Sequence, residues 1–245
     1  MEGNFDILAM AAHPDDIELG AAGTLIKHLR KGQSVAIVDL TRGELGTRGT
    51  PELRSIEAEN AARVMGVQHR ENAGLPDGFF ENREESLRIL IRFIRRFRPR
   101  IVIANALEDR HPDHGRGGRL IADACFLAGL AKIETQDLGK NQLAWRPKRV
   151  FHMIQDRFLE PDFIVDISDT FESKMEAIAQ FKSQFHDPDS SEPQTYISSE
   201  KFMAFIQHRA ADLGKRIGKK YGEGFLCENT PAIADLDQLL YPEFP

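Results

Sequence analysis

The sequence predicts an α/β protein, with a Rossmann-like, mostly parallel sheet, helices on both faces and a C-terminal cap region. Short apolar runs rich in Val, Ile and Ala alternate with longer segments whose apolar residues recur at helical spacing. Glycine or proline separates many of these segments. The first apolar run ends at His-Pro-Asp and not in a Gly-x-Gly-x-x-Gly turn, which disfavours a nucleotide-binding Rossmann protein.

The first elements follow from apolar runs and their stops. Residues 5–12 form a short apolar run that predicts a buried strand, and residues 16–31 predict a helix that ends at Gly32. Residues 34–41, rich in Val and Ile, predict a second strand. Residues 42–50 are rich in glycine and predict a loop.

Helices and strands continue to alternate up to about residue 130. A helix is expected over residues 51–65, with Pro51 at its start and Gly66 as its stop. Residues 67–72 predict a third strand, and an apolar stripe over residues 87–97 predicts the next helix. Residues 100–106 predict a fourth buried strand, and residues 114–130 the helix after it.

Beyond residue 131 the pattern is looser. Residues 131–148 are expected to cross the surface, residues 149–155 and 163–167 are candidate strands, and residues 169–181 and 199–217 are candidate helices. Residues 186–199 read as a long loop, which in a compact domain is usually functional or disordered. We therefore expect a single domain over residues 1–245, with a soft division into residues 1–130 and residues 131–245.

Composition limits the class of protein. Of 245 residues, 41% are hydrophobic and 29% charged, the balance of a soluble globular protein. A net charge of -6 disfavours a nucleic-acid partner. Two distant cysteines, Cys125 and Cys227, indicate a reducing compartment. Neither a secretory signal nor a stretch of ~20 apolar residues is evident, so no membrane association and a cytoplasmic location are expected.

Two copies of one motif follow the first and fourth predicted strands. They are His13-Pro14-Asp15-Asp16 and His111-Pro112-Asp113-His114. Imidazole and carboxylate are ligands of divalent metals such as zinc. Parallel sheets bind ligands at the carboxyl ends of strands where the strand order reverses, and the first and fourth strands meet there in the common arrangement. The motifs are therefore expected to converge.

The spacing predicts the ligand set. Residues three apart on a helical turn share a face, so His13 and Asp16 can approach one ion together with His114. Three protein ligands leave a position for water, which is typical of catalytic zinc and indicates a metal-dependent hydrolase.

The remaining motif residues are candidates for the chemistry. Asp15 is placed to act as general base, and His111 as general acid or as an imidazolium that stabilises an oxyanion. Asp113 is expected to orient His111 and raise its pKa. The alternative for either motif alone is a plain N-cap, in which the Asp side chain bonds free helix amides.

With these motifs in hand, the chain resembles the LmbE-like, or PIG-L, family of zinc-dependent N-deacetylases of N-acetylglucosaminyl compounds. The resemblance is carried by AAHPDDIELGAAGTL and the later HPDHG, and also by residues 41–46 and 54–57. Residues 221–225 resemble the ending of the bacillithiol-biosynthesis branch, whose substrate is N-acetylglucosaminyl malate. We expect the GEGF part of this ending to shape a loop.

The resemblance implies Zn²⁺ on His13, Asp16 and His114, with Asp15 as base and His111 as its charged partner. Iron(II) or another divalent ion remains open. It also implies that Arg54 and Glu44 face the sugar.

Two further residues are candidates for contacts with the substrate. Arg110 could bind a carboxylate of the substrate or lie at the rim, and Tyr196 could donate to the oxyanion or be a loop aromatic.

The expected reaction is hydrolysis of the acetamide of an N-acetylglucosamine conjugate, with N-acetylglucosaminyl malate as first choice. Alternative substrates are chitin oligosaccharides, mycothiol-type precursors and mercapturate-like conjugates. A non-catalytic carbohydrate-binding or nucleotide-binding relative is the alternative from another class, although a pure binder needs neither Asp15 nor His111. The resemblance favours a homo-oligomer.

Overall fold

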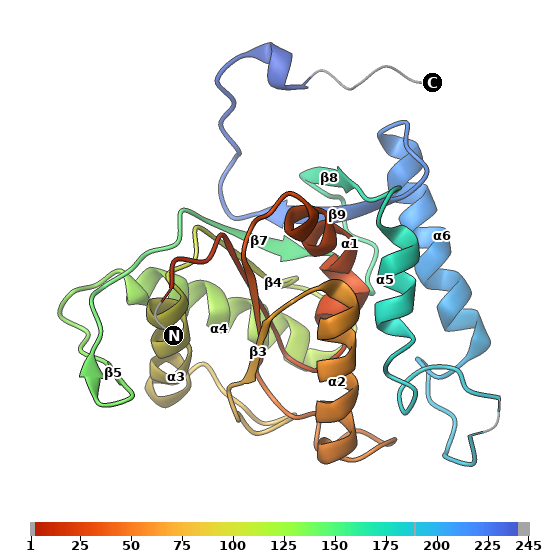
Figure 1. The fold of residues 1–245 in the computed structure, drawn as a ribbon, viewed down its shortest axis with the longest axis horizontal. Coiled ribbons are helices and arrows are strands. Elements are labelled where there is room, and N and C mark those ends of the chain that lie inside the picture. The colour runs from red at the N-terminus through yellow and green to blue at the C-terminus, as the bar shows by residue number, and fades with distance from the viewer. Residues whose placement is uncertain (1–2, 189, 240–245) are drawn as a thin grey trace.

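The structure is a computed structural model that describes residues 3–188 and 190–239. Within these residues a seven-stranded sheet has the order β3-β2-β1-β4-β7-β9-β8 (Figure 1). The strands of this sheet are β1 (Ile7–Ala11), β2 (Val35–Asp39), β3 (His69–Asn72), β4 (Ile101–Asn105), β7 (Arg149–Met153), β8 (Phe163–Asp166) and β9 (Gly222–Cys227). Pairing is parallel from β3 to β7, whereas β9 runs antiparallel to both its neighbours. The predicted mostly parallel α/β fold is confirmed.

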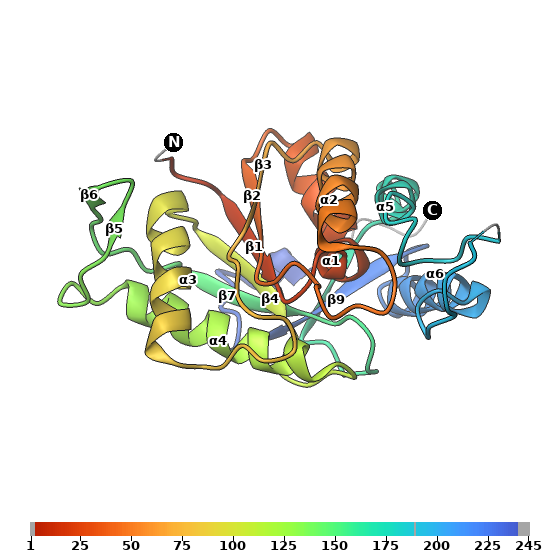
Figure 2. The same cartoon turned by 90° about the horizontal axis from the view of Figure 1, so that it is seen from below.

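Helices cover both faces of the sheet (Figure 2). They are α1 (Asp16–Arg30), α2 (Pro51–Met65), α3 (Glu84–Phe97), α4 (Pro112–Ala128), α5 (Phe171–Ile178) and α6 (Glu200–Arg216). Alternate residues of a strand point to opposite faces. Leu8 and Met10 of β1 therefore pack with α3 and α4, while Ile7 and Ala9 pack with α1 and α2.

Local sequence signals explain where α2 begins and ends. Thr50 caps the helix by accepting a hydrogen bond from the Leu53 amide, and Pro51 occupies the first turn. Gly66 ends the helix with φ of 84°, a left-handed conformation that glycine adopts without steric cost. The predicted bounds of this helix match the structure.

Helix α4 begins two residues earlier than predicted. Pro112 occupies its first position, which suits proline because that position needs no amide hydrogen. His111 is the N-cap residue, and its ring nitrogen Nδ1 accepts a hydrogen bond from the Asp113 amide. His114 therefore lies inside the first helical turn and not in front of it.

The segment between α4 and β7 is a surface excursion, as predicted. It holds only a small hairpin of β5 (Gln136–Asp137) and β6 (Lys140–Asn141). The loop predicted over residues 186–199 separates α5 from α6. Strands β7, β9 and β8 extend the same sheet as β1 and β4. The soft division of the domain near residue 131 stays a prediction.

The expectation that the GEGF segment shapes a loop was wrong. Residues 222–227 form β9, a strand between β7 and β8. Two glycines concealed it, because glycine disfavours strands in general. Here they permit close packing: a Cβ on Gly222 would lie 2.6 Å from Ile164 Cγ2 and 3.0 Å from the backbone nitrogen of Gly214 in α6.

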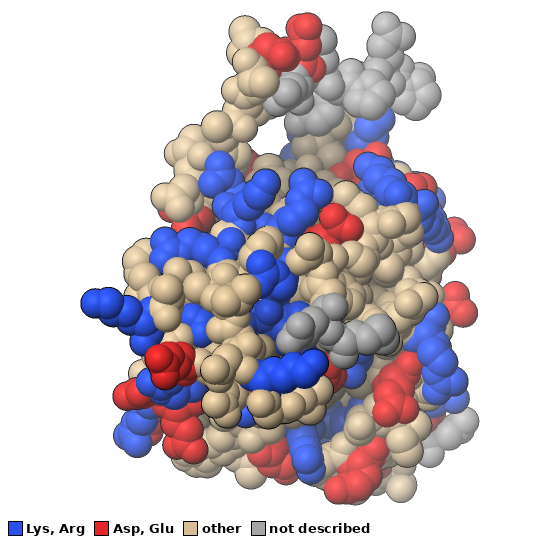
Figure 3. All heavy atoms as spheres, turned by 60° about the vertical axis from the view of Figure 1, so that its left-hand side comes forward, with Lys and Arg blue, Asp and Glu red and all other residues tan. Residues whose placement is uncertain are grey.

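Residues 228–239 leave the sheet after β9 and end in the 3-10 helix η1 (Leu236–Leu239) (Figure 1). None of the helices in the described residues is both long enough and apolar enough to cross a bilayer. Charge is unevenly spread, and Figure 3 shows a face on which Lys and Arg gather in spite of the net charge of -6. The expected lack of a nucleic-acid partner, which rests on net charge, stays a prediction.

The position of β9 in the sheet leads to a prediction for Phe225, which is 1% exposed. Phe225→Ala is expected to lower the free energy of unfolding by about 3–5 kcal/mol, because it leaves a cavity in the core. Chemical denaturation measures the change. Phe79→Ala is the control, since Phe79 is 75% exposed and should shift the value by less than about 0.5 kcal/mol. Equal, small changes in the free energy of unfolding for the two variants would contradict the buried position of Phe225 in β9.

Candidate metal centre and active site

A cavity of about 390 Å³ is lined by residues that follow β1 and β4. Since these strands are neighbours and run in parallel, the two His-Pro-Asp motifs meet at their carboxyl ends, as the sequence predicted. The motif residues on its wall are His13, Asp15, His111 and His114. A cavity of about 530 Å³ against α2 has no histidine in its wall, and one of about 620 Å³ has only His69. The candidate site is therefore the cavity that both motifs line.

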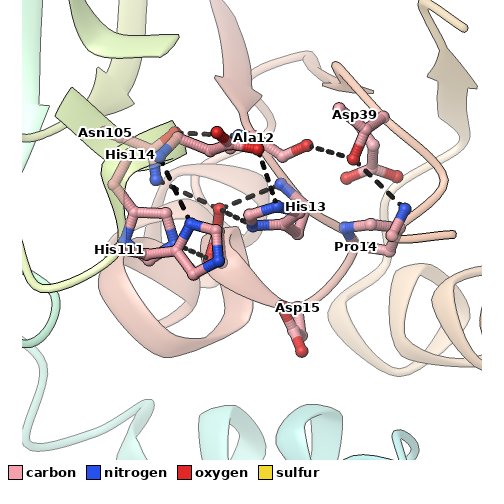
Figure 4. Close-up of polar contacts among 12 residues, drawn as sticks. Ala12, His13, Pro14, Asp15, Asp39, Asn105, His111 and His114 are labelled. Atoms are coloured by element: carbon pink, nitrogen blue, oxygen red, sulfur yellow. Dashed lines mark hydrogen bonds and ion pairs between the residues drawn. The ribbon is translucent and has the colours of Figure 1, made fainter. Parts of the chain in front are cut away.

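The carboxylate of Asp16 lies between two imidazoles. Its Oδ2 is 3.6 Å from His13 Nδ1, and its Oδ1 is 3.1 Å from His114 Nε2. Two amide side chains hold it in place: Asn105 donates to Oδ2 at 3.2 Å and Gln155 to Oδ1 at 2.6 Å. Figure 4 shows the rings of His13, His111 and His114 gathered beside one another, next to Asn105.

Each of the two imidazoles uses its other nitrogen to bond a second carboxylate. His13 Nε2 lies 3.0 Å from Asp77 Oδ1, and His114 Nδ1 lies 2.6 Å from Asp109 Oδ2. Such partners fix the tautomer and orientation of metal-binding histidines. They leave Nδ1 of His13 and Nε2 of His114 facing Asp16, so the donor set fits a divalent metal ion.

Buried carboxylates dominate the electrostatics of the site. Burial opposes protonation of His13, but Asp113, Asp16 and Asp77 outweigh it and hold its pKa well above the usual value. Burial likewise opposes protonation of His114, yet mainly Asp16, together with Asp109, raises its pKa to about 9. The pKa of Asp16 lies well below its usual value, because the two histidines outweigh its burial. A site so rich in negative charge favours a cation.

Two groups in the described residues have donor atoms close enough to share an ion: His13 with His111 and His114, and His13 with Asp77 and Asp113. The predicted set, with Asp16 in place of His111, is not among them. In the second group, Asp77 Oδ2 already accepts the Leu45 amide and Asp113 Oδ2 the Gly78 amide, both at 2.8 Å. The set of His13, Asp16 and His114 remains the prediction that we carry forward.

Asp15 points away from the histidines (Figure 4). Its φ of 120° is one that L-residues rarely adopt, and such strain tends to occur at functional sites. Its Oδ2 pairs with Arg54 Nη2 at 3.2 Å. Burial raises the pKa of Asp15 to about 7, although Arg54 opposes the shift. The N-cap interpretation of Asp15 was wrong, because its side chain makes no capping hydrogen bond.

Arg54 lines the cavity and bonds the backbone of two of its loops. Its Nη2 also donates to the Pro14 carbonyl at 2.6 Å, and its Nη1 to the Gly43 carbonyl at 3.3 Å. A Cβ on Gly43, whose φ is 65°, would lie 1.8 Å from Arg54 Nη1, so only glycine fits there.

Glu44 differs from its expected role of facing the sugar. Its two carboxylate oxygens accept the amides of Asp77, at 2.9 Å, and Arg42, at 3.1 Å. Glu44 is also not among the residues that line the cavity. In the structure Glu44 instead connects two loops beside the site, because both oxygens of its carboxylate accept backbone amides.

The expected contact between Asp113 and His111 was wrong in its atoms. The Asp113 amide, not its carboxylate, donates to His111 Nδ1 at 3.2 Å. The carboxylate bonds the Gly78 amide and Arg116 instead, and lies 3.5 Å from His13 Nε2. The pKa of His111 is lowered, first by burial and then by the charges on His13 and His114, so the expected rise was also wrong.

Arg110 and Tyr196 both reach the cavity wall. The Arg110 guanidinium lies over the Tyr196 ring, 4.6 Å from its centroid, and its Nε is 3.3 Å from Asp156 Oδ2. Both side chains remain about half exposed, so they lie at the mouth of the cavity. Whether Tyr196 donates to the oxyanion and Arg110 binds a carboxylate of the substrate stays a prediction.

Several residues at the site were missed by sequence reasoning. Asp77 lies in a Pro-Asp-Gly sequence that signals a turn, and Asp109 lies two residues before His111, where its proximity could have drawn notice. Asn105 ends a strand, and Gln155 follows one. Arg48 and Arg209 also line the cavity, and neither residue lies in a recognisable pattern.

Comparisons with known proteins agree with this geometry. A family model described as PIG-L, GlcNAc-PI de-N-acetylase, matches residues 8–125, which contain both His-Pro-Asp motifs. The crystal structure of the conserved protein TT1542 from Thermus thermophilus is similar, with a TM-score of 0.84 and 34% sequence identity. The similarity covers 94% of this chain and 97% of that one.

Two curated relatives have named activities. Diacetylchitobiose deacetylase of Thermococcus kodakarensis is 28% identical over 229 residues, which cover 89% of this chain and 81% of the relative. A probable N-acetyl-alpha-D-glucosaminyl L-malate deacetylase 2 of Bacillus anthracis is 27% identical over 140 residues, which cover 51% of this chain and 61% of the relative.

The contact between Asp109 and His114 leads to a prediction about cation affinity. Asp109→Asn should weaken the binding of Zn²⁺ roughly 10-fold to 100-fold, because the carboxylate orients the imidazole and increases its basicity. Competition with a chromophoric chelator measures the affinity. Glu108→Gln makes the same change of charge at the exposed neighbouring residue and should leave affinity unchanged. Equal affinities in all three proteins would refute this role of Asp109.

Proposed function

Since this chain belongs to the PIG-L family of N-acetylglucosamine deacetylases, we propose that it hydrolyses the acetamide with a divalent metal ion held by His13, Asp16 and His114. The observation that carries this proposal is the carboxylate of Asp16 between two imidazoles, each backed by a second carboxylate. Zinc is our first choice, and iron(II) has the same ligand preference. The bound ion would supply Lewis acidity, which polarises a carbonyl and eases deprotonation of water.

Asp15 is the proposed general base. Its carboxylate lines the cavity, and a pKa of about 7 lets it accept a proton at neutral pH and release it again. Arg54 fixes its direction through the ion pair. Water attacks the acetamide carbon as its proton passes to Asp15, the carbon–nitrogen bond breaks, and the sugar amine takes a proton as acetate leaves.

His111 is the proposed donor to the oxyanion. Because its Nδ1 accepts the Asp113 amide, a neutral imidazole carries its proton on Nε2. With a lowered pKa the ring is neutral at pH 7, so it acts as a hydrogen-bond donor and not as the imidazolium first expected. The Tyr196 hydroxyl is a second candidate donor from the mouth of the cavity.

Arginines on the cavity wall favour an acidic conjugate. Among the described residues, Arg54 pairs with Asp15, Arg48 with Glu192, and Arg110 with Asp156. Arg209 lines the cavity and donates to the Leu19 carbonyl at 3.4 Å, while Asp156, Asp109 and Glu223 act on it through their charges alone. A partly buried guanidinium with no ion pair to a carboxylate of the described residues suits an anionic group of the substrate.

We therefore favour N-acetylglucosaminyl malate, the substrate in bacillithiol biosynthesis, over a neutral chitin oligosaccharide or a mycothiol-type precursor. The probable malate deacetylase of Bacillus anthracis among the relatives supports this choice. A cytoplasmic homo-oligomer remains part of the proposal.

The decisive experiment measures acetate release from N-acetylglucosaminyl malate. Asp15→Asn should keep its metal content but lose turnover by roughly 10²-fold to 10⁴-fold, because proton transfer in the transition state is lost. His114→Ala should lose the metal as well, as elemental analysis would show. A chelator should stop the native protein. A native protein that binds the sugar and releases no acetate, with or without added metal, would establish the non-catalytic alternative.

Selectivity for acidic substrates tests Arg209. Arg209→Gln should lower kcat/KM for N-acetylglucosaminyl malate by roughly 10-fold to 100-fold, because a hydrogen bond to a charged group contributes about 1.5–3 kcal/mol. It should change kcat/KM for neutral diacetylchitobiose by less than about threefold. Arg216→Gln, on the same helix but paired with Glu160, is the matched control. An equal loss for both substrates would argue against recognition of an acidic group.

A further inference from the structure

The carboxylate of Glu223, from β9, accepts hydrogen bonds from backbone amides in the middle of α1. Its Oε1 accepts the Gly23 amide at 3.0 Å and its Oε2 the Thr24 amide at 2.7 Å. Both amides belong to the interior of the helix, where they would ordinarily bond the carbonyls of Leu19 and Gly20. A carboxylate therefore takes part in the hydrogen-bond ladder of α1.

Lys174, from α5, completes the arrangement. Its Nζ donates to Glu223 Oε1 at 2.6 Å and to the Leu19 carbonyl at 2.9 Å. The exposed fractions of the two side chains are 3% for Lys174 and 2% for Glu223. The Thr170 hydroxyl also donates to the Gly23 carbonyl, at 2.9 Å. Side chains from the C-terminal half thus bond both donors and acceptors of one turn of α1.

Glycines in α1 permit this close approach. A Cβ on Gly20 would lie 2.5 Å from Met153 Sδ, and a Cβ on Gly23 would lie 2.8 Å from Ile167 Cγ2. Both distances are shorter than any ordinary contact, so α1 lies closer to β7 and to the end of β8 than a helix with larger residues could.

Stability alone does not explain the pair. A buried ion pair usually contributes no more than apolar side chains of the same size, since both charges lose their hydration. What distinguishes this pair is its place. The turn that it bonds follows directly on Asp15 and Asp16, and Leu19 itself lines the cavity.

We infer that Lys174 and Glu223 are positioning residues that hold the first turn of α1 in the register that places Asp16 between His13 and His114. Without the two charged side chains, the Gly23 and Thr24 amides lose their carboxylate acceptor, and the Leu19 carbonyl keeps only Arg209, at 3.4 Å, as a side-chain donor. The first turn would then be free to shift relative to the rest of α1 and move Asp16. The inference rests on the proposed function for its metal readout.

Three variants separate positioning from charge balance: Lys174→Met, Glu223→Gln and the double variant. Each single change leaves an unpaired buried charge or a mismatched donor, so the midpoint of thermal unfolding should fall. The double variant removes both charges at nearly constant volume and should recover most of that midpoint. Its Zn²⁺ affinity should nevertheless stay roughly 10-fold to 100-fold weaker, with kcat reduced and KM near the native value.

Two further measurements complete the test. Amide hydrogen exchange over residues 16–24 needs no metal, and in the double variant it should be faster than in the native protein. Arg96→Met breaks the ion pair between Arg96 and Glu71 beside α3, so any loss of stability should come without a loss of Zn²⁺ affinity.

A double variant with native Zn²⁺ affinity, native kcat and native exchange would overturn the inference, because the pair would then only neutralise its own charges. A different outcome would refute the proposed function: the native protein would neither bind the metal nor release acetate. In that case the exchange rates alone decide whether the pair holds the turn.

Discussion

Parallel pairing of β1 with β4 is the constraint on which the site depends. The pairing places Ile7 opposite Ile101 and Ala9 opposite Ile103, so both strands end at the same edge of the sheet. A His-Pro-Asp segment begins at His13, shortly after β1 ends at Ala11, and another at His111, after β4 ends at Asn105. Side chains from remote parts of the chain are thereby delivered to one carboxylate, Asp16, without any long or flexible connection.

Asp15 and Asp16 show how position alone separates the behaviour of two adjacent carboxyl groups. Burial raises the pKa of Asp15 to about 7, and one arginine opposes it only in part. Asp16 is equally buried, yet the two imidazoles beside it hold its pKa well below the usual value. The helix begins between them, which turns the two side chains in different directions. One group can therefore exchange protons while its neighbour stays ionised.

Sequence reasoning found the parts whose physical cause is local. Apolar runs gave the parallel strands, and the repeated motif gave His13 and His114 as partners. It failed where a role depends on residues remote in the chain. Gln155 and Arg209 reach the cavity only because β7 and α6 pack there. The misassigned contact of Asp113 depends on the direction of a backbone amide, and β9 was hidden because its glycines serve packing and not a turn.

The last strand of the described residues, β9, lies inside the sheet between β7 and β8, and β8 has no other neighbour in it. During synthesis on a ribosome, the segments that carry both histidine motifs emerge long before residues 222–227. The nascent chain can thus pair β1 with β4 early, but β8 stays unpaired and Glu223 is missing until β9 has emerged. A chain interrupted before residue 222 would carry both motifs without the strand that joins β7 to β8.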